Sequence, residues 1–174
     1  MVQREVTYSP NTQPSQDTPT AASVPDGSGD TVQTSPIGWV AKQAKIYEES
    51  GGTKGTTAGG SPCLLLDYQG RRSGRWHRTV LIYTRDAGAY LVVASNGGAD
   101  HHPKWYLSIA EHPNVRLRVG TDRFPAHAET LSPDEKARVW PYVAATFAQY
   151  DEYQKKTSRD IPVVRLERIT SDQP

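Results

Sequence analysis

Basic side chains gather in one short polar stretch of the chain. Four arginines fall within eight residues that contain no acidic residue: Arg71, Arg72, Arg75 and Arg78. A guanidinium presents a planar fork of donors that binds phosphate or carboxylate through two parallel hydrogen bonds. Lys54 adds a further cation upstream. The stretch therefore predicts a site for a polyanionic ligand, and a solvated hairpin tip is the alternative that the residue types leave open.

Small residues form a second candidate feature, the run from Ala94 to Asp100. Ser95, Asn96, Gly97 and Gly98 follow a predicted strand and precede a predicted helix. Such a turn offers backbone N–H groups and a helix N-terminus to an anion or a polarised ring. A glycine pair by itself indicates only a turn, whereas the complete run is more specific.

Aromatic residues spaced by three form the third feature. Phe147, Tyr150 and Tyr153 share one face of a predicted helix. A face of this kind is more often part of the core than a wall of a ligand site. Its two hydroxyl groups, however, would be able to border a planar ligand.

Several function classes are disfavoured by composition. A net charge of +1, from 20 basic and 19 acidic residues, gives no global footprint for nucleic acid. The neighbours His101 and His102 point apart and lack a third ligand at suitable spacing, so no metal site is expected. Cys63 is the single cysteine, which excludes an internal disulfide. No apolar run approaches the roughly 18 residues of a membrane span, and no secretory signal is read, so a cytoplasmic location is expected.

The elements that must position these residues follow from hydrophobic spacing and turn signals. Helices are predicted over 37–47 and 104–111, and from a capping box at Ser132 through Tyr142 and on to Tyr153. Strands are predicted over 63–69, 75–85, 90–96, 114–119, 124–131 and 161–166. The strands follow one another too closely for parallel crossovers. The order predicts an α+β fold, mainly antiparallel, in which a small β-barrel carries decorating helices.

Residues 1–35 differ in composition from the rest of the chain. Pro, Ser, Thr, Gln, Asp and Gly dominate this segment, and large apolar side chains are few. Too little apolar surface is present to offset the entropy of ordering the backbone. We therefore expect a disordered polar tail over 1–35 and one folded domain over 36–174.

Four motifs in register identify a family resemblance over about residues 36–169. They are Gly70-Arg71-Arg72-Ser73-Gly74-Arg75 with Arg78, Ala94 to Asp100 with Pro103-Lys104-Trp105-Tyr106, His112-Pro113-Asn114-Val115, and Tyr150-Asp151-Glu152-Tyr153-Gln154 leading to Ile161-Pro162-Val163. The chain resembles the deazaflavin-dependent nitroreductase family of actinobacteria. The resemblance implies a split β-barrel like that of FMN-binding proteins, and reduced coenzyme F420 as the cofactor.

The resemblance also implies roles for particular residues. The phosphate and polyglutamate tail of F420 would be bound by Arg71, Arg72, Arg78 and Lys54. The deazaflavin end would be bound by Tyr83, Ser95, Asn96, Gly97, Gly98 and Trp105. The substrate side would be formed by Trp39, Phe147, Tyr150 and Tyr153, with Tyr150 and Tyr153 as catalytic candidates and Tyr153 the better hydrogen-bond donor.

The implied activity is hydride transfer from reduced F420 to a small electrophilic acceptor, namely an activated alkene, a quinone or a nitroaromatic compound. Phe147 stands where nitro-reducing members carry tyrosine, which disfavours nitroimidazole activation. Two alternatives stay open: a split-barrel protein that binds flavin or haem, and a protein that carries F420 without catalysis. A monomer and a homodimer are both compatible with the sequence, as is peripheral contact of helix 37–47 with a membrane.

Overall fold

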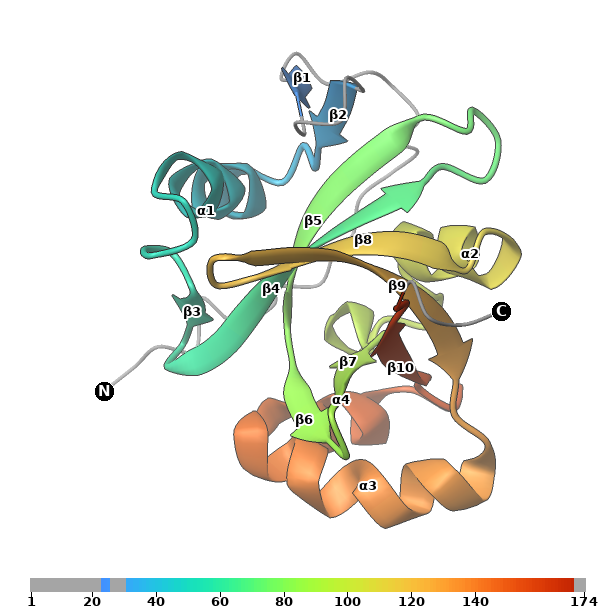
Figure 1. Ribbon diagram of the computed structural model, residues 1–174. Coiled ribbons are helices and arrows are strands. Elements are labelled where there is room, and N and C mark those ends of the chain that lie inside the picture. The colour runs from blue at the N-terminus through green and yellow to red at the C-terminus, as the bar shows by residue number, and fades with distance from the viewer. Residues whose placement is uncertain (1–22, 26–30, 171–174) are drawn as a thin grey trace.

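One curved sheet carries most of the fold in the computed structural model, which describes residues 23–25 and 31–170 (Figure 1). Its strands follow the order β1-β2-β5-β4-β8-β9-β10-β7-β6, and β3 pairs with β4 outside this path. The strand bounds are β1 Ser23–Pro25, β2 Thr31–Thr34, β3 Thr57–Ala58, β4 Ser61–Gln69, β5 Trp76–Ile82, β6 Thr84–Asp86, β7 Ala89–Val93, β8 Asn114–Val119, β9 Asp122–Thr130 and β10 Val163–Arg168. Among these residues only the β2–β5 pairing is parallel.

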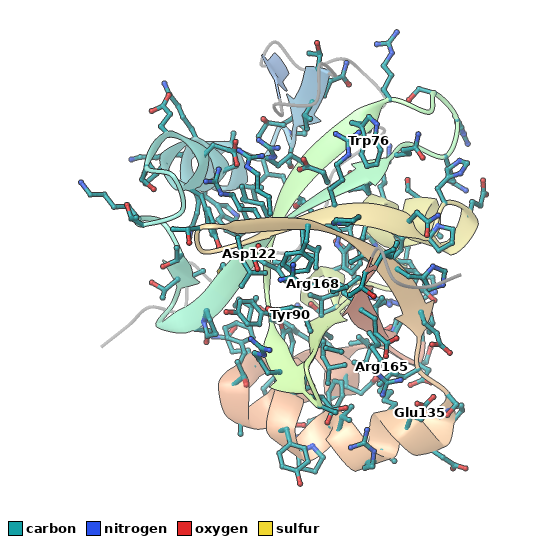
Figure 2. The ribbon with its side chains drawn as sticks, in the orientation of Figure 1. Trp76, Tyr90, Asp122, Glu135, Arg165 and Arg168 are labelled. Atoms are coloured by element: carbon teal, nitrogen blue, oxygen red, sulfur yellow. The ribbon has the colours of Figure 1, made fainter. Side chains whose placement is uncertain are left out.

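In the described part of the chain, four helices and one 3₁₀ turn decorate the sheet. They are α1 Gly38–Glu49, the turn η2 Asn96–Gly98, α2 Lys104–Glu111, α3 Pro133–Thr146 and α4 Gln149–Lys156. At the start of α3, the Ser132 hydroxyl accepts from the Glu135 backbone N–H, and the Glu135 side chain accepts from the Ser132 N–H. Arg165 of β10 donates to the same Glu135 at 3.0 Å (Figure 2). The predicted capping residue therefore also ties α3 to the sheet.

The strand predicted over 75–85 is two strands in the structure. β5 ends at Ile82 and pairs with β4, whereas β6 begins at Thr84 and pairs with β7. The chain passes from one half of the sheet to the other at Tyr83. Because the apolar pattern continues through this residue, the sequence does not show that the pairing strand changes there. β7 likewise ends at Val93 rather than at residue 96, because the backbone leaves the extended region at Ser95, which has helical angles of φ −75° and ψ −34°.

Part of the expected disordered tail is folded. β2 pairs in parallel with Trp76–Arg78 of β5, and the side chain of Val32 is fully buried. The prediction is wrong for residues 31–34 because a distant strand supplies their hydrogen bonds, which local composition does not reveal. β1 pairs in turn with β2. The remainder of the expected tail, residues 1–22 and 26–30, lies outside the described residues, as do residues 171–174 of the expected domain.

A buried ion pair joins the two central strands. Arg78 of β5 is 2% exposed, and its Nε and Nη2 donate to the two carboxylate oxygens of Asp67 on β4 at 2.7 and 2.6 Å. A third charge, Glu48 of α1, lies 3.4 Å from Arg78 Nη1. Burial lowers the pKa of the Arg78 guanidinium, but the hydrogen bonds and charges of Asp67 and Glu48 outweigh that effect and hold the pKa above its usual value.

The same glutamate connects α1 to two more strands. Glu48 accepts from Arg118 of β8 at 2.7 Å and from Arg123 of β9 at 2.5 Å. Burial raises the pKa of the Glu48 carboxyl, yet the three arginines together hold the pKa below its usual value. The five charges form one network that fixes the helix to the sheet.

We expect Arg78→Met to lower the free energy of unfolding by roughly 3–5 kcal/mol, because Asp67 would stay buried without its cation. Arg75→Met is the control, since Arg75 is exposed at the hairpin between β4 and β5 and should cost less than about 0.5 kcal/mol. Urea denaturation of both variants measures the difference. Equal losses in the two variants would contradict a structural role for Arg78.

Candidate functional site

The turn that follows β7 bends sharply away from the sheet. Asn96, Gly97 and Gly98 have φ values of 47°, 64° and 83°. Glycine adopts this left-handed region without steric cost, and asparagine tolerates it better than most residues. The Gly98 N–H donates to Ser95 O at 2.9 Å, and the Ala99 N–H donates to Asn96 O at 3.1 Å. Three consecutive left-handed residues therefore form a compact loop between β7 and α2.

Several buried polar atoms at this turn have no partner among the described residues. They are Ser95 Oγ and Asn96 Oδ1 in the turn and Trp105 Nε1 on α2. Buried polar atoms in native proteins nearly always form hydrogen bonds, so each unpartnered group needs a specific explanation. Ser95 Oγ and Asn96 Oδ1 can accept hydrogen bonds and Trp105 Nε1 can donate one, and the polar edge of a planar ring carrying both carbonyl and N–H groups has matching partners for both kinds of atom. The residues present thus fit a deazaflavin cofactor.

The turn packs directly on α4. A Cβ atom added to Gly98 would lie 2.9 Å from the backbone oxygen of Tyr153 and 3.1 Å from Cβ of Lys156. Because the closest obstacle is backbone, only glycine permits this approach. The structure therefore brings together two of the predicted features, the small-residue turn and the tyrosine-bearing helix.

The three predicted aromatic rings cluster, but they do not share one helical face: Tyr150 and Tyr153 lie on α4, whereas Phe147 precedes α4 in extended backbone (φ −147°, ψ 98°). The ring of Phe147 lies 4.8 Å from that of Tyr150 and 6.3 Å from that of Tyr153, and the two tyrosine rings lie 6.4 Å apart. Phe147 and Tyr150 are buried in the core, whereas Tyr153 is only partly buried. The Tyr153 hydroxyl donates to Gln149 Oε1 at 3.0 Å. The arrangement favours Tyr153 over Tyr150 as the side chain that reaches a ligand.

The predicted anion site is only partly assembled. Arg71 and Arg72 are exposed in the loop between β4 and β5, and Lys54 is exposed in the loop after α1. In Figure 1 the tip of that hairpin stands apart from α4. α2 begins soon after the turn and packs on β4, the first strand of that hairpin.

Arg78 does not belong to the predicted anion site. The arginine spacing suggested that Arg78 faces a ligand, but its guanidinium is buried and already holds Asp67 in a two-point pair. A ligand anion would have to displace a carboxylate at ideal geometry. We correct the prediction: Arg78 is structural, and the exposed arginines of the hairpin are the candidates for anion binding.

Two further predicted residues flank the sheet. Tyr83 sits at the switch from β5 to β6, with its ring edge-on to Tyr90 at 5.3 Å, and burial raises the pKa of its hydroxyl. Trp39 lies on α1, which packs on β5, and its buried Nε1 has no partner among the described residues. α1 and α4 lie far apart in Figure 1, so the structure does not bring Trp39 to the aromatic cluster at α4.

Other kinds of site can be judged for the part of the chain that the structure describes. Within it, no three His, Cys, Asp or Glu side chains gather as a possible metal site. No helix there has both the length and the apolar character needed to cross a bilayer.

The structure adds two residues, Arg159 and His102, that the sequence did not indicate as part of this site. Arg159, in the loop between α4 and β10, directs its guanidinium to the turn and donates to His102 Nδ1 at 2.9 Å. Because arginine has only donors, Nδ1 must accept, and neutral His102 therefore carries its proton on Nε2. Burial lowers the pKa of His102, and the charges of Arg159 and His101 lower it further. Their sequence separation gave no signal of this contact.

We expect the pair to make stability depend on pH. The pKa of His102 is below its usual 6.5 in the folded protein, so below about pH 6.5 the unfolded chain binds a proton that the folded one resists. The free energy of unfolding should fall as the pH falls through this window. His102→Asn keeps an acceptor but does not titrate, so its melting temperature should fall less between pH 7.5 and 5.5. Parallel profiles for the two proteins would contradict the assignment.

Comparison with known proteins tests the family resemblance. A family model described as F420H2-dependent quinone reductase matches residues 39–168. An F420H2-dependent quinone reductase of Mycobacterium tuberculosis is 40% identical over 127 residues, covering 71% of this chain and 85% of the relative. This finding confirms the resemblance drawn from the four motifs.

Two solved structures share the fold. One, described as an F420-H2 dependent reductase, is 34% identical with a TM-score of 0.57 and covers 61% of this chain and 94% of its own. Another, described as a domain-swapped dimer, is 34% identical with a TM-score of 0.60 and covers 76% and 100%. They support the expected split β-barrel with decorating helices. On these matches and the site geometry together, the chain belongs to the F420H2-dependent quinone reductase family.

Proposed function

We propose that this protein catalyses hydride transfer from reduced F420 to a quinone-type acceptor. The observation that carries the proposal is the buried turn at Ser95–Gly98, which holds the unpartnered Ser95 Oγ and Asn96 Oδ1 and packs at Gly98 on the helix that bears Tyr153. A ring held at the turn would lie beside an aromatic wall. Family membership supplies the class of cofactor, and the quinone names the class of acceptor given to the relatives.

When bound, reduced F420 supplies the hydride, and the protein supplies binding, orientation and electrostatics. Ser95 and Asn96 would accept hydrogen bonds from the ring, and the Trp105 indole would donate to it. Arg71, Arg72 and Lys54 would bind the anionic tail with charge-assisted hydrogen bonds. Anchoring both ends fixes the cofactor, so the reacting carbon is held close to the acceptor.

Tyr153 is the proposed donor to the acceptor. Negative charge develops on a quinone oxygen as the hydride arrives, and a preorganised hydroxyl there lowers the barrier. The hydroxyl now bonded to Gln149 would turn to that oxygen when an acceptor enters. Phe147 and Tyr150 pack behind Tyr153 and hold its ring. Solvent completes the proton supply to the hydroquinone product.

A homodimer is the proposed assembly, supported by the solved relative described as a domain-swapped dimer. The cytoplasm is the proposed location, supported by the free, buried thiol of Cys63. Mass photometry of the purified protein would distinguish a monomer from a dimer.

The function itself is tested by mixing the protein with oxidised F420 in a binding titration, then following the oxidation of reduced F420 by absorbance with benzoquinone, naphthoquinone and nitroaromatic acceptors. We expect saturable binding and turnover with the quinones. Binding without turnover for any acceptor would support a carrier instead, and binding of flavin or haem in preference to F420 would overturn the cofactor assignment.

We expect Arg72→Ala to weaken F420 binding by roughly tenfold, since one charge-assisted hydrogen bond contributes about 1.5 kcal/mol or more. Added salt should weaken binding to the wild type as well, because the contact is exposed. Arg138→Ala on α3 is the control, an exposed arginine paired with Asp86 away from the hairpin. Affinity equal to that of the control would remove the hairpin from the cofactor site.

We expect Tyr153→Phe to lower turnover about tenfold at saturating F420, because the aromatic wall stays while the donor is lost and water compensates in part. The affinity for F420 and the melting temperature should change little. Tyr142→Phe on the exposed side of α3 is the matched control. A wild-type turnover number in the Tyr153 variant would show that its hydroxyl takes no part in the reaction.

A further inference from the structure

The loop between α4 and β10 holds one arginine in a fixed position. The Arg159 N–H donates to Thr157 Oγ1 at 3.2 Å, and its carbonyl accepts from Gln154 Nε2 at 2.8 Å. The same Gln154 side chain accepts from the Ile161 N–H at 3.0 Å and from Lys136 Nζ at 2.9 Å. The backbone of Arg159 is therefore held on both sides before its side chain makes any contact.

The side chain of Arg159 spans the two ends of the turn. At the start of the turn, Nη2 donates to Ser95 O at 2.7 Å, and both terminal nitrogens lie 3.3 Å from Ala94 O. At the end of the turn, Nε donates to Ala99 O at 2.8 Å. One guanidinium thus closes the loop that contains Asn96, Gly97 and Gly98 by bonding to the carbonyls that flank it.

These contacts need the geometry of arginine. Three backbone carbonyls and the ring nitrogen of His102 are reached at once by donors that point in different directions from one plane. A lysine ammonium is a single point charge with three donors and cannot span both ends of the loop. Burial lowers the pKa of Arg159, and Asp100 opposes that shift, but a guanidinium stays charged at neutral pH.

The backbone of this loop would be poorly ordered without the contacts that Arg159 makes. Its residues Asn96 to Gly98 are in left-handed conformations, and glycines have more backbone freedom to lose than other residues. Ser95 Oγ and Asn96 Oδ1 can act on a ligand only if the backbone that carries them is already ordered. Ordering the loop in the free protein means that binding does not have to supply that entropy.

We propose that Arg159 is the positioning residue of the cofactor turn: it clamps the loop from Ala94 to Ala99 in the binding conformation before a ligand arrives. The proposal rests on the proposed function for the identity of the ligand, F420, but not for the clamp itself. In the proposed mechanism, Arg159 contacts neither the acceptor nor the reacting atoms. It acts through the turn.

Amide hydrogen exchange of the full-length protein without cofactor tests the clamp directly. In Arg159→Met, exchange at Gly98 and Ala99 should become at least about tenfold faster, while amides of β4 and β5 keep their wild-type rates. Arg138→Met is the matched control, because Arg138 also joins two elements through its side chain, α3 and β6, but does so by donating to Asp86 and not to the turn. Acceleration spread evenly over the whole chain would mean that Arg159 merely stabilises the fold, and unchanged rates at the turn would overturn the clamp.

Binding of oxidised F420 gives the second readout. The dissociation constant should rise about tenfold or more in Arg159→Met, since the ordering cost moves to the binding step. Arg159→Lys keeps the charge, and we expect it to resemble Arg159→Met because a single ammonium cannot hold both ends of the loop. Wild-type affinity in Arg159→Lys would show that charge alone is needed and would overturn the geometric clamp.

The two proposals fail in different ways. If the wild-type protein does not bind F420, the proposed function is wrong, and the exchange rates of Gly98 and Ala99 still decide whether Arg159 clamps the turn. If the wild type binds F420 but the Arg159 variants bind equally well with unchanged exchange, the function stands and the clamp is wrong.

Discussion

A network of five charges, all but the exposed Arg123 buried or half-buried, determines how the sheet and its first helix fit together. Asp67 and Arg78 pair across two central strands, and Glu48 of α1 brings in Arg118 and Arg123 from the next two. Charges in a poorly polarisable interior are tolerable only when each has its partner, so the positions of α1, β4, β5, β8 and β9 become interdependent. The curved sheet on which the site is built depends on that mutual satisfaction.

At the other half of the sheet, contact between backbones replaces charge as the main constraint. Gly98 lets the turn approach the carbonyl of Tyr153, and β10 extends from the loop that carries Arg159 to pair with β7. The turn thus lies between the strand that precedes it and the helix and loop that come some sixty residues later in the chain. The turn and the aromatic residues of the site are thus held against each other although they lie far apart in the sequence.

This division suits an enzyme that handles a long cofactor. The ring end would meet a rigid, buried loop, where unpartnered polar atoms require precise placement. The tail end would meet exposed side chains on a hairpin, where charge attracts an anion without exact geometry. Hydride transfer requires an ordered site around the cofactor ring, whereas binding of the anionic tail requires only complementary charge.

The sequence alone predicted much of this protein. Hydrophobic spacing predicted α1, the entry at Pro103 predicted α2, and the residues from Ser132 to Glu135 predicted the capping box of α3. Four motifs indicated the family and its cofactor. All these signals are local. Tertiary structure decided what depends on distant partners. β2 became ordered through its pairing with β5, and Arg78 turned inward to Asp67 instead of outward to a ligand. Arg159 became part of the site because its guanidinium, in one loop, donates to backbone carbonyls of another loop. Contacts between residues so far apart in the sequence leave no local pattern from which they could be predicted.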